Sequence, residues 1–162
     1  MTHRCKNHNC KVCRVVKMQR WPCRTNKLGP KPDKFGDELC GDTLMAYTNE
    51  SWGLEGEEYG VVLFDRGAKY YGGYPVGTKS AEDAEDSIRH YLGNSAVKRF
   101  YTDCAPDLIR AGQNLKLMHD TSTPYRPDTN GVAESAVRRV VEGTRLTLAQ
   151  SGLKEKGWAD AT

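Results

Sequence analysis

Residues 123–134 read TPYRPDTNGVAE, a stretch that joins a proline-rich loop to the start of a long helix. Pro124 and Pro127 each restrict the backbone φ angle, so they stiffen the loop and favour an extended path. Asn130 and Gly131 follow and provide the turn into the helix. The stretch therefore predicts a rigid loop that ends at a helix N-terminus.

The predicted helix runs from Asn130 to about Gln150 and is amphipathic. Glu134 falls in about its first turn, and Arg138 lies one turn further along on the same side. An acidic and a basic side chain are thus expected to project together beside the loop. The apolar side consists of Val132, Ala133, Ala136, Val137, Val140, Val141 and Leu148.

Upstream of this helix, hydrophobic periodicity and turn residues predict the order β-β-β-α-β-α-β. Three antiparallel strands followed by alternating helices and strands indicate an α/β fold, with a mixed five-stranded sheet flanked by helices. Ser80 is the expected N-cap of the first helix. The predicted strands are 38–47, 59–65, 69–76, 97–102 and 115–119, and the predicted helices are 81–92 and 105–111.

Two further acidic residues lie in or directly after predicted strands, where their carboxylates are candidate metal ligands. Asp42 lies inside the first predicted strand, where a buried carboxylate is costly unless it is paired or binds a metal. Asp103 directly follows the strand 97–102, at the point where a chain leaves the core. Each acid alone is more typical of a solvated surface. Together with Glu134 they would match the carboxylates that converge in two-metal phosphoryl transfer.

The stretch 123–134 resembles the segment around the third catalytic acid in integrases of long-terminal-repeat retrotransposons and retroviruses. The family pattern is Thr-Pro-Tyr-x-Pro-x-Thr-Asn-Gly-x-x-Glu. Supporting blocks occur in the family's order: Tyr101–Pro106 is similar to the segment around the second acid, Phe64–Arg66 to the strand and turn after the first acid, and Gly157–Ala161 to a Trp-x-x-Ala block. The resemblance covers about residues 35–162.

This resemblance implies an RNase H-like catalytic core that processes the 3′ ends of element DNA and transfers them into target DNA. Its polynucleotidyl transferase chemistry would use Mg²⁺ or Mn²⁺ held by Asp42, Asp103 and Glu134. DNA, in the form of element ends and target, is the implied partner, and a homo-oligomer is expected. The expected DNA-contacting residues are Lys17, Arg20, Arg126, Asn130 and Arg138.

The chain departs from the family pattern at Cys104, where Asn is usual. A second candidate also exists for the first acid. Asp37, in the segment 35–41, resembles the Asp-x-x-Gly of one retrotransposon group. We prefer Asp42, because it falls in mid-strand and lies closer to the Phe64–Arg66 block.

The first 34 residues form a basic arm, with ten Lys or Arg against one acidic residue. Its last part, 24–34, has the Pro, Gly and polar composition of a linker, so we divide the chain into an arm (1–34) and a catalytic core (35–162). A basic arm on an acidic body indicates a polyanionic partner. The core is expected to be truncated at its C-terminus relative to the family.

Cys10 and Cys13 form a Cys-x-x-Cys pair, which is half of a tetrahedral Zn²⁺ site. By resemblance, this pair matches the second half of the His-His-Cys-Cys module that precedes such cores. In that module the histidines lie some tens of residues upstream, and we expect this pair to be missing here. His3, Cys5 and His8 are possible substitutes, and a half-site is the alternative.

No apolar run approaches the length of a membrane span, and the N-terminus lacks the apolar segment of a signal peptide. We therefore expect a cytosolic or nuclear protein, neither secreted nor membrane-bound, and we choose the nucleus, after synthesis in the cytoplasm. Two alternatives to an integrase stay open. One is a non-catalytic nucleic-acid-binding remnant of a retrotransposon polyprotein, and the other is a nuclease acting on RNA–DNA hybrids.

Overall fold

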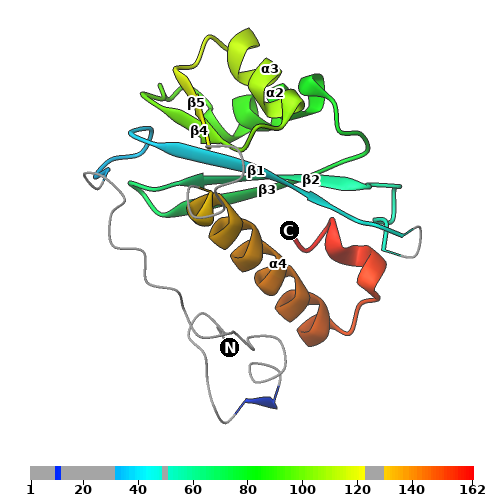
Figure 1. The fold of residues 1–162 in the computed structure, drawn as a ribbon. Coiled ribbons are helices and arrows are strands. Elements are labelled where there is room, and N and C mark those ends of the chain that lie inside the picture. The colour runs from blue at the N-terminus through cyan, green and yellow to red at the C-terminus, as the bar shows by residue number, and fades with distance from the viewer. Residues whose placement is uncertain (1–9, 12–31, 49–50, 123–129) are drawn as a thin grey trace.

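The computed structural model describes residues 10–11, 32–48, 51–122 and 130–162. Five strands and three long helices follow in the predicted order (Figure 1). The predicted α/β class is therefore confirmed. The elements are β1 (Leu39–Met45), β2 (Tyr59–Asp65), β3 (Tyr70–Val76), α2 (Ala81–Leu92), β4 (Phe100–Thr102), α3 (Pro106–Asn114), β5 (His119–Thr121), α4 (Gly131–Ser151) and the 3₁₀ helix η2 (Glu155–Trp158).

The sheet has the strand order β3-β2-β1-β4-β5. Strands β1, β2 and β3 pair antiparallel, whereas β4 pairs parallel to β1 and β5 pairs parallel to β4. In the parallel pair at the centre, Leu39 lies opposite Phe100 and Gly41 opposite Thr102. The mixed five-stranded sheet is thus the one that the sequence predicts.

Helices cover both faces of the sheet (Figure 1). Helices α2 and α3 pack against each other on one face, and α4 crosses the opposite face over β1, β2 and β3. Successive side chains of a strand point to opposite faces. Leu39 and Gly41 therefore face α2 and α3, whereas Cys40 and Asp42 face the α4 side.

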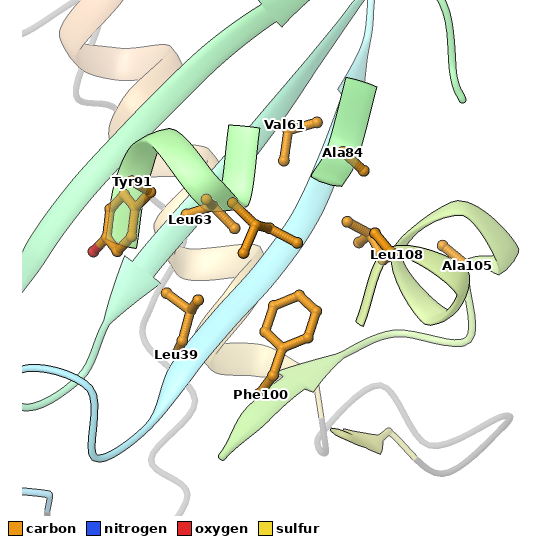
Figure 2. Packing of buried hydrophobic residues seen from close by; sticks show 10 residues of the cluster. Leu39, Val61, Leu63, Ala84, Tyr91, Phe100, Ala105 and Leu108 are labelled. Atoms are coloured by element: carbon orange, nitrogen blue, oxygen red, sulfur yellow. The ribbon is translucent and has the colours of Figure 1, made fainter. Parts of the chain in front are cut away.

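The main hydrophobic core lies between the sheet and helices α2 and α3 (Figure 2). Ser80 caps α2 as predicted, because its side chain accepts a hydrogen bond from the backbone N–H of Asp83. Burial of the apolar side of α2 against β2 and β3 then stabilises this layer. The buried core residues are Leu39, Val61, Leu63, Ala84, Ile88, Tyr91, Phe100, Ala105, Leu108 and Ala111.

The last strand does not lie at 115–119, where the sequence predicts it, but at His119–Thr121. The residues before it terminate α3 instead. The backbone N–H of Leu117 donates to the carbonyl of Gly112, and Lys116 has a positive φ of 54°. This helix-ending turn uses the apolar residues whose alternation resembles a strand.

The predicted strand 97–102 is also shorter than expected, since only Phe100–Thr102 pair with neighbours. Helix α4 begins and ends within a residue of its predicted bounds. In the part of the chain that the structure describes, no helix has the length and apolarity needed to cross a membrane.

Candidate active site

The pairing of β1 with β4 brings two acidic residues side by side. Gly41 lies opposite Thr102 in this parallel pair, and the next residues on the two strands are Asp42 and Asp103. Neighbouring strands are about 4.8 Å apart, and residues in register point to the same face. Asp42 and Asp103 are therefore neighbours on the face that α4 covers.

Glu134 approaches the same place from α4. It lies in the first turn of that helix and is exposed. Its charge acts on Asp42, whose pKa is raised to about 6, mainly by burial and further by the carboxylates of Asp103 and Glu134. A backbone hydrogen bond from Thr43 and the positive charge of Lys79 oppose this rise. The three acids thus share one electrostatic environment.

Backbone hydrogen bonds fix one oxygen of each strand acid. The N–H of Thr43 donates to Oδ1 of Asp42 at 2.8 Å. The N–H of Ala105 donates to Oδ1 of Asp103 at 3.0 Å. The backbone in the middle of β1 and at the N-cap of α3 therefore orients both carboxylates.

The donor set is of the kind that Mg²⁺ and Mn²⁺ prefer, since hard divalent cations bind carboxylate oxygens. Across the described residues, however, no three His, Cys, Asp or Glu side chains are close enough together to hold a metal ion. The three acids therefore lie near one another on the α4 face without forming a cluster close enough to hold a metal ion.

Asp37, the alternative first acid, lies in a different environment two residues before β1. Its carboxylate accepts hydrogen bonds from Lys98 Nζ at 2.6 Å and from the backbone N–H groups of Asp33 and Lys34 at 3.1 and 3.0 Å. These contacts, above all the one from Lys98, lower the pKa of Asp37 to about 2. Asp37 is thus held in a turn by an ion pair.

The other predicted site residues are only partly described. Arg138 is exposed on α4, and Asn130 takes the N-cap position of that helix with a buried Oδ1 that has no hydrogen-bond partner among the described residues. Cys10 is half-buried, and Cys104 is exposed beside Asp103. Among the predicted site residues, those that lie outside the described part are Cys13, Lys17, Arg20, Arg126 and the possible zinc ligands His3, Cys5 and His8.

A second cluster of polar side chains, which the sequence does not predict, lies next to the acids. Asp107, in the first turn of α3, is buried, and its Oδ2 accepts a hydrogen bond from Thr43 Oγ1 at 3.5 Å. Lys79 Nζ lies 4.0 Å from Asp107 Oδ1. Thr43 lies on β1, Asp107 on α3 and Lys79 in the connection between β3 and α2, so only the fold brings them together.

Solved structures of retroviral integrases have the same fold. A chain of the cryo-EM structure of the simian T-cell lymphotropic virus intasome, in complex with PP2A regulatory subunit B56 gamma, matches with a TM-score of 0.65 and 16% identity, over 95% of this chain and 56% of that one. The catalytic core domain of BIV integrase matches with a TM-score of 0.53 and 13% identity, over 78% of this chain and 80% of that one.

The chain therefore has the fold of a retroviral integrase catalytic core, with its RNase H-like five-stranded sheet. It spans only about half of the intasome chain's length, 56%. No family model matches the sequence. No curated protein matches it either.

Proposed function

We propose that this chain is the catalytic core of a DNA integrase, a polynucleotidyl transferase that processes DNA 3′ ends and joins them to target DNA. The observation that carries this proposal is the parallel register that sets Asp42 beside Asp103, with the charge of Glu134 acting on Asp42. Convergent carboxylates from two strands and a helix are what two-metal strand cleavage needs. The integrase fold supports the choice of DNA as substrate.

In this proposal, Asp42, Asp103 and Glu134 hold Mg²⁺ or Mn²⁺. The bound ions would supply the activation of a water or a DNA 3′-hydroxyl and the stabilisation of the leaving oxygen. The chain's own contribution is orientation. The N–H groups of Thr43 and Ala105 each hold one carboxylate oxygen, so the strand acids cannot rotate freely. Burial of Asp42 raises the free energy of its ionised form, which favours binding of a compensating cation.

Asp42 rather than Asp37 is our choice for the first acid. Asp42 and Asp103 directly follow the last paired residues of the two strands, Gly41 and Thr102, whereas Asp37 is paired with Lys98 outside the strand. A carboxylate already neutralised by a lysine gains less from a metal ion.

The partners of this site follow from its proposed chemistry. Arg138 and Asn130 would contact DNA next to Glu134, and Arg126, Lys17 and Arg20 would extend the contact along the loop and the basic arm. We propose a homo-oligomer that acts on DNA in the nucleus. Zn²⁺ binding through Cys10 and Cys13 is a separate proposal for the arm.

A strand-nicking and strand-transfer assay on short duplex DNA in Mg²⁺ or Mn²⁺ tests the proposal. Glu134→Gln should reduce product to the metal-free background, because the amide cannot replace a charged metal ligand. Glu142→Gln is the matched control: it makes the same change on the same helix, two turns away, and should leave activity unchanged. Activity that survives Glu134→Gln would contradict the three-acid site.

The second candidate, a nucleic-acid-binding remnant without catalysis, is favoured by one observation: the three side chains do not form a closed metal cage. The same assay separates the two candidates. A folded wild-type chain that binds DNA, yet makes no product in either metal, would establish the remnant.

A further inference from the structure

We propose that Lys79 binds a phosphate of the DNA backbone beside the three acids, and that Asp107 is the residue that positions it. This inference rests on the proposed function, because it names a substrate contact of the same site. Lys79 would be a binding residue, and Asp107 would act only through it.

The topology brings Lys79 to the correct end of the sheet. Strands β1 and β3 both pair antiparallel to β2, so they run in the same direction, and β4 runs parallel to β1. Lys79 follows the end of β3, and Asp103 follows the end of β4. Both connections therefore leave the sheet at the same end, where the chain passes to α2 and α3 (Figure 1).

Lys79 and Asp107 form an ion pair but no hydrogen bond. The Asp107 side chain is only 7% exposed, and its Oδ1 has no hydrogen-bond partner among the described residues. Lys79 Nζ lies 4.0 Å from this oxygen, which is within ion-pair range but too long for a hydrogen bond. A buried carboxylate is costly without a compensating charge. Asp107 therefore restrains the ammonium near the sheet, yet does not take up its donors.

Asp107 is also connected to the first acid. Thr43 Oγ1 donates to Asp107 Oδ2 at 3.5 Å, while the backbone N–H of Thr43 donates to Asp42 Oδ1. Thr43 thus links the two carboxylates through the thickness of the sheet. Through Asp107 and Thr43, the lysine is therefore connected to the first acid.

The charges at this end of the sheet are mostly negative, so a phosphate that binds there needs a positively charged partner. Asp42, Asp103, Glu134 and Asp107 are all acidic, and their field repels DNA phosphates. The side chain of Lys79 is 38% exposed, so its ammonium group is accessible to a large ligand. An ammonium is a suitable point charge for a phosphate oxygen. From its place beside Asp107, the ammonium of Lys79 would bind the incoming phosphodiester.

Binding of a labelled DNA duplex by the full chain, measured by fluorescence anisotropy at several salt concentrations, tests this inference. Loss of one phosphate contact reduces the slope of log K against log salt by about one unit. We expect that reduction in Lys79→Gln and not in Lys79→Arg. Lys69→Gln is the matched control, because Lys69 is an exposed lysine at the opposite end of β3.

Asp107→Asn tests the positioning role. It should raise the KM for DNA in the nicking assay and leave kcat nearly unchanged. Combined with Lys79→Gln, it should add little, because both changes act on one contact. A purely structural role for Asp107 would lower the melting temperature without this dependence on Lys79.

The outcomes separate this inference from the proposed function. Metal-dependent nicking by the wild type, with equal salt slopes for Lys79→Gln and Lys69→Gln, overturns the lysine contact alone. A slope that depends on Lys79, in a chain that does not nick DNA, supports the contact and overturns catalysis. A wild type that neither binds nor nicks DNA overturns both.

Discussion

On the sheet face that α2 and α3 cover, Leu39 and Phe100 lie opposite each other and are fully buried. On the α4 face, three residues further along the chain, Asp42 of β1 lies beside Asp103, which directly follows β4. The first face lowers the free energy of folding by removing apolar surface from water. The second holds carboxylates that repel each other, one of them largely buried. The comparison shows that a single pair of strands contributes to the apolar core on one side and carries the candidate site on the other.

The largest effect should follow from Phe100→Ala, which removes a side chain with 0% exposure from the apolar face (Figure 2). We expect a loss of about 3–5 kcal/mol in the free energy of unfolding, because both buried area and packing are lost. Urea denaturation followed by circular dichroism measures it. Tyr101→Ala changes the next residue of β4, on the α4 face, where the side chain is only half-buried. An equal loss in both variants would remove the distinction between the faces.

Asp42→Asn should have a smaller effect of opposite sign. The pKa of Asp42 rises from 3.8 to about 6 in the folded chain, so the folded state loses stability as the pH rises through that range. Without divalent metal, the variant should be more stable than the wild type by roughly 2 kcal/mol at about pH 7, and equal to it at about pH 4. Denaturation at the two pH values gives both numbers.

Divalent metal provides the control for this prediction. Added Mg²⁺ should stabilise the wild type by binding the folded state and should stabilise Asp42→Asn much less. A variant that is less stable than the wild type at both pH values would show that Asp42 has a structural partner instead.

The smallest effect is expected for Arg139→Ala on the α4 face. Arg139 donates a hydrogen bond to the Tyr71 hydroxyl, and its guanidinium carbon lies 5.8 Å from the centre of that ring. Exposed contacts of this kind contribute about 0.5–1 kcal/mol. Thermal unfolding of Arg139→Ala beside Arg139→Lys would measure the packing of α4 on β3. A loss as large as that of Phe100→Ala would make α4, rather than α2 and α3, the main source of stability.

Much of the fold was accessible from local patterns. The predicted bounds of 59–65 and 81–92 coincide with β2 and α2, because an apolar β-rich run and a Ser80 cap depend only on nearby residues. The prediction for 115–119 was wrong for the same reason. Leu115 and Leu117 alternate as in a strand, but the end of α3 forms hydrogen bonds with this segment. A local pattern cannot show which of two neighbouring elements a residue will form hydrogen bonds with.

The candidate site, too, was predicted only in part from local patterns. The motif at 123–134 indicated Glu134, and positions inside and directly after predicted strands indicated Asp42 and Asp103. Their proximity, however, depends on the parallel pairing of β1 and β4, which are far apart in the sequence. Lys79, Thr43 and Asp107 were not predicted, since each looks like an ordinary surface or helix-cap residue when read alone.

The sequence by itself determined the order of the strands and helices and the two-sided character of α4, and it nominated Asp103, Glu134 and either Asp42 or Asp37 as candidate acids, because hydrophobic periodicity, caps and a continuous motif are local properties of the chain. Only the tertiary structure decided that Asp42, and not Asp37, lies beside Asp103, and that Asp107 lies within ion-pair distance of Lys79. The physical reason is that strand pairing and helix packing are long-range interactions. They set the distances between residues of distant segments, and the charges at this site act through those distances.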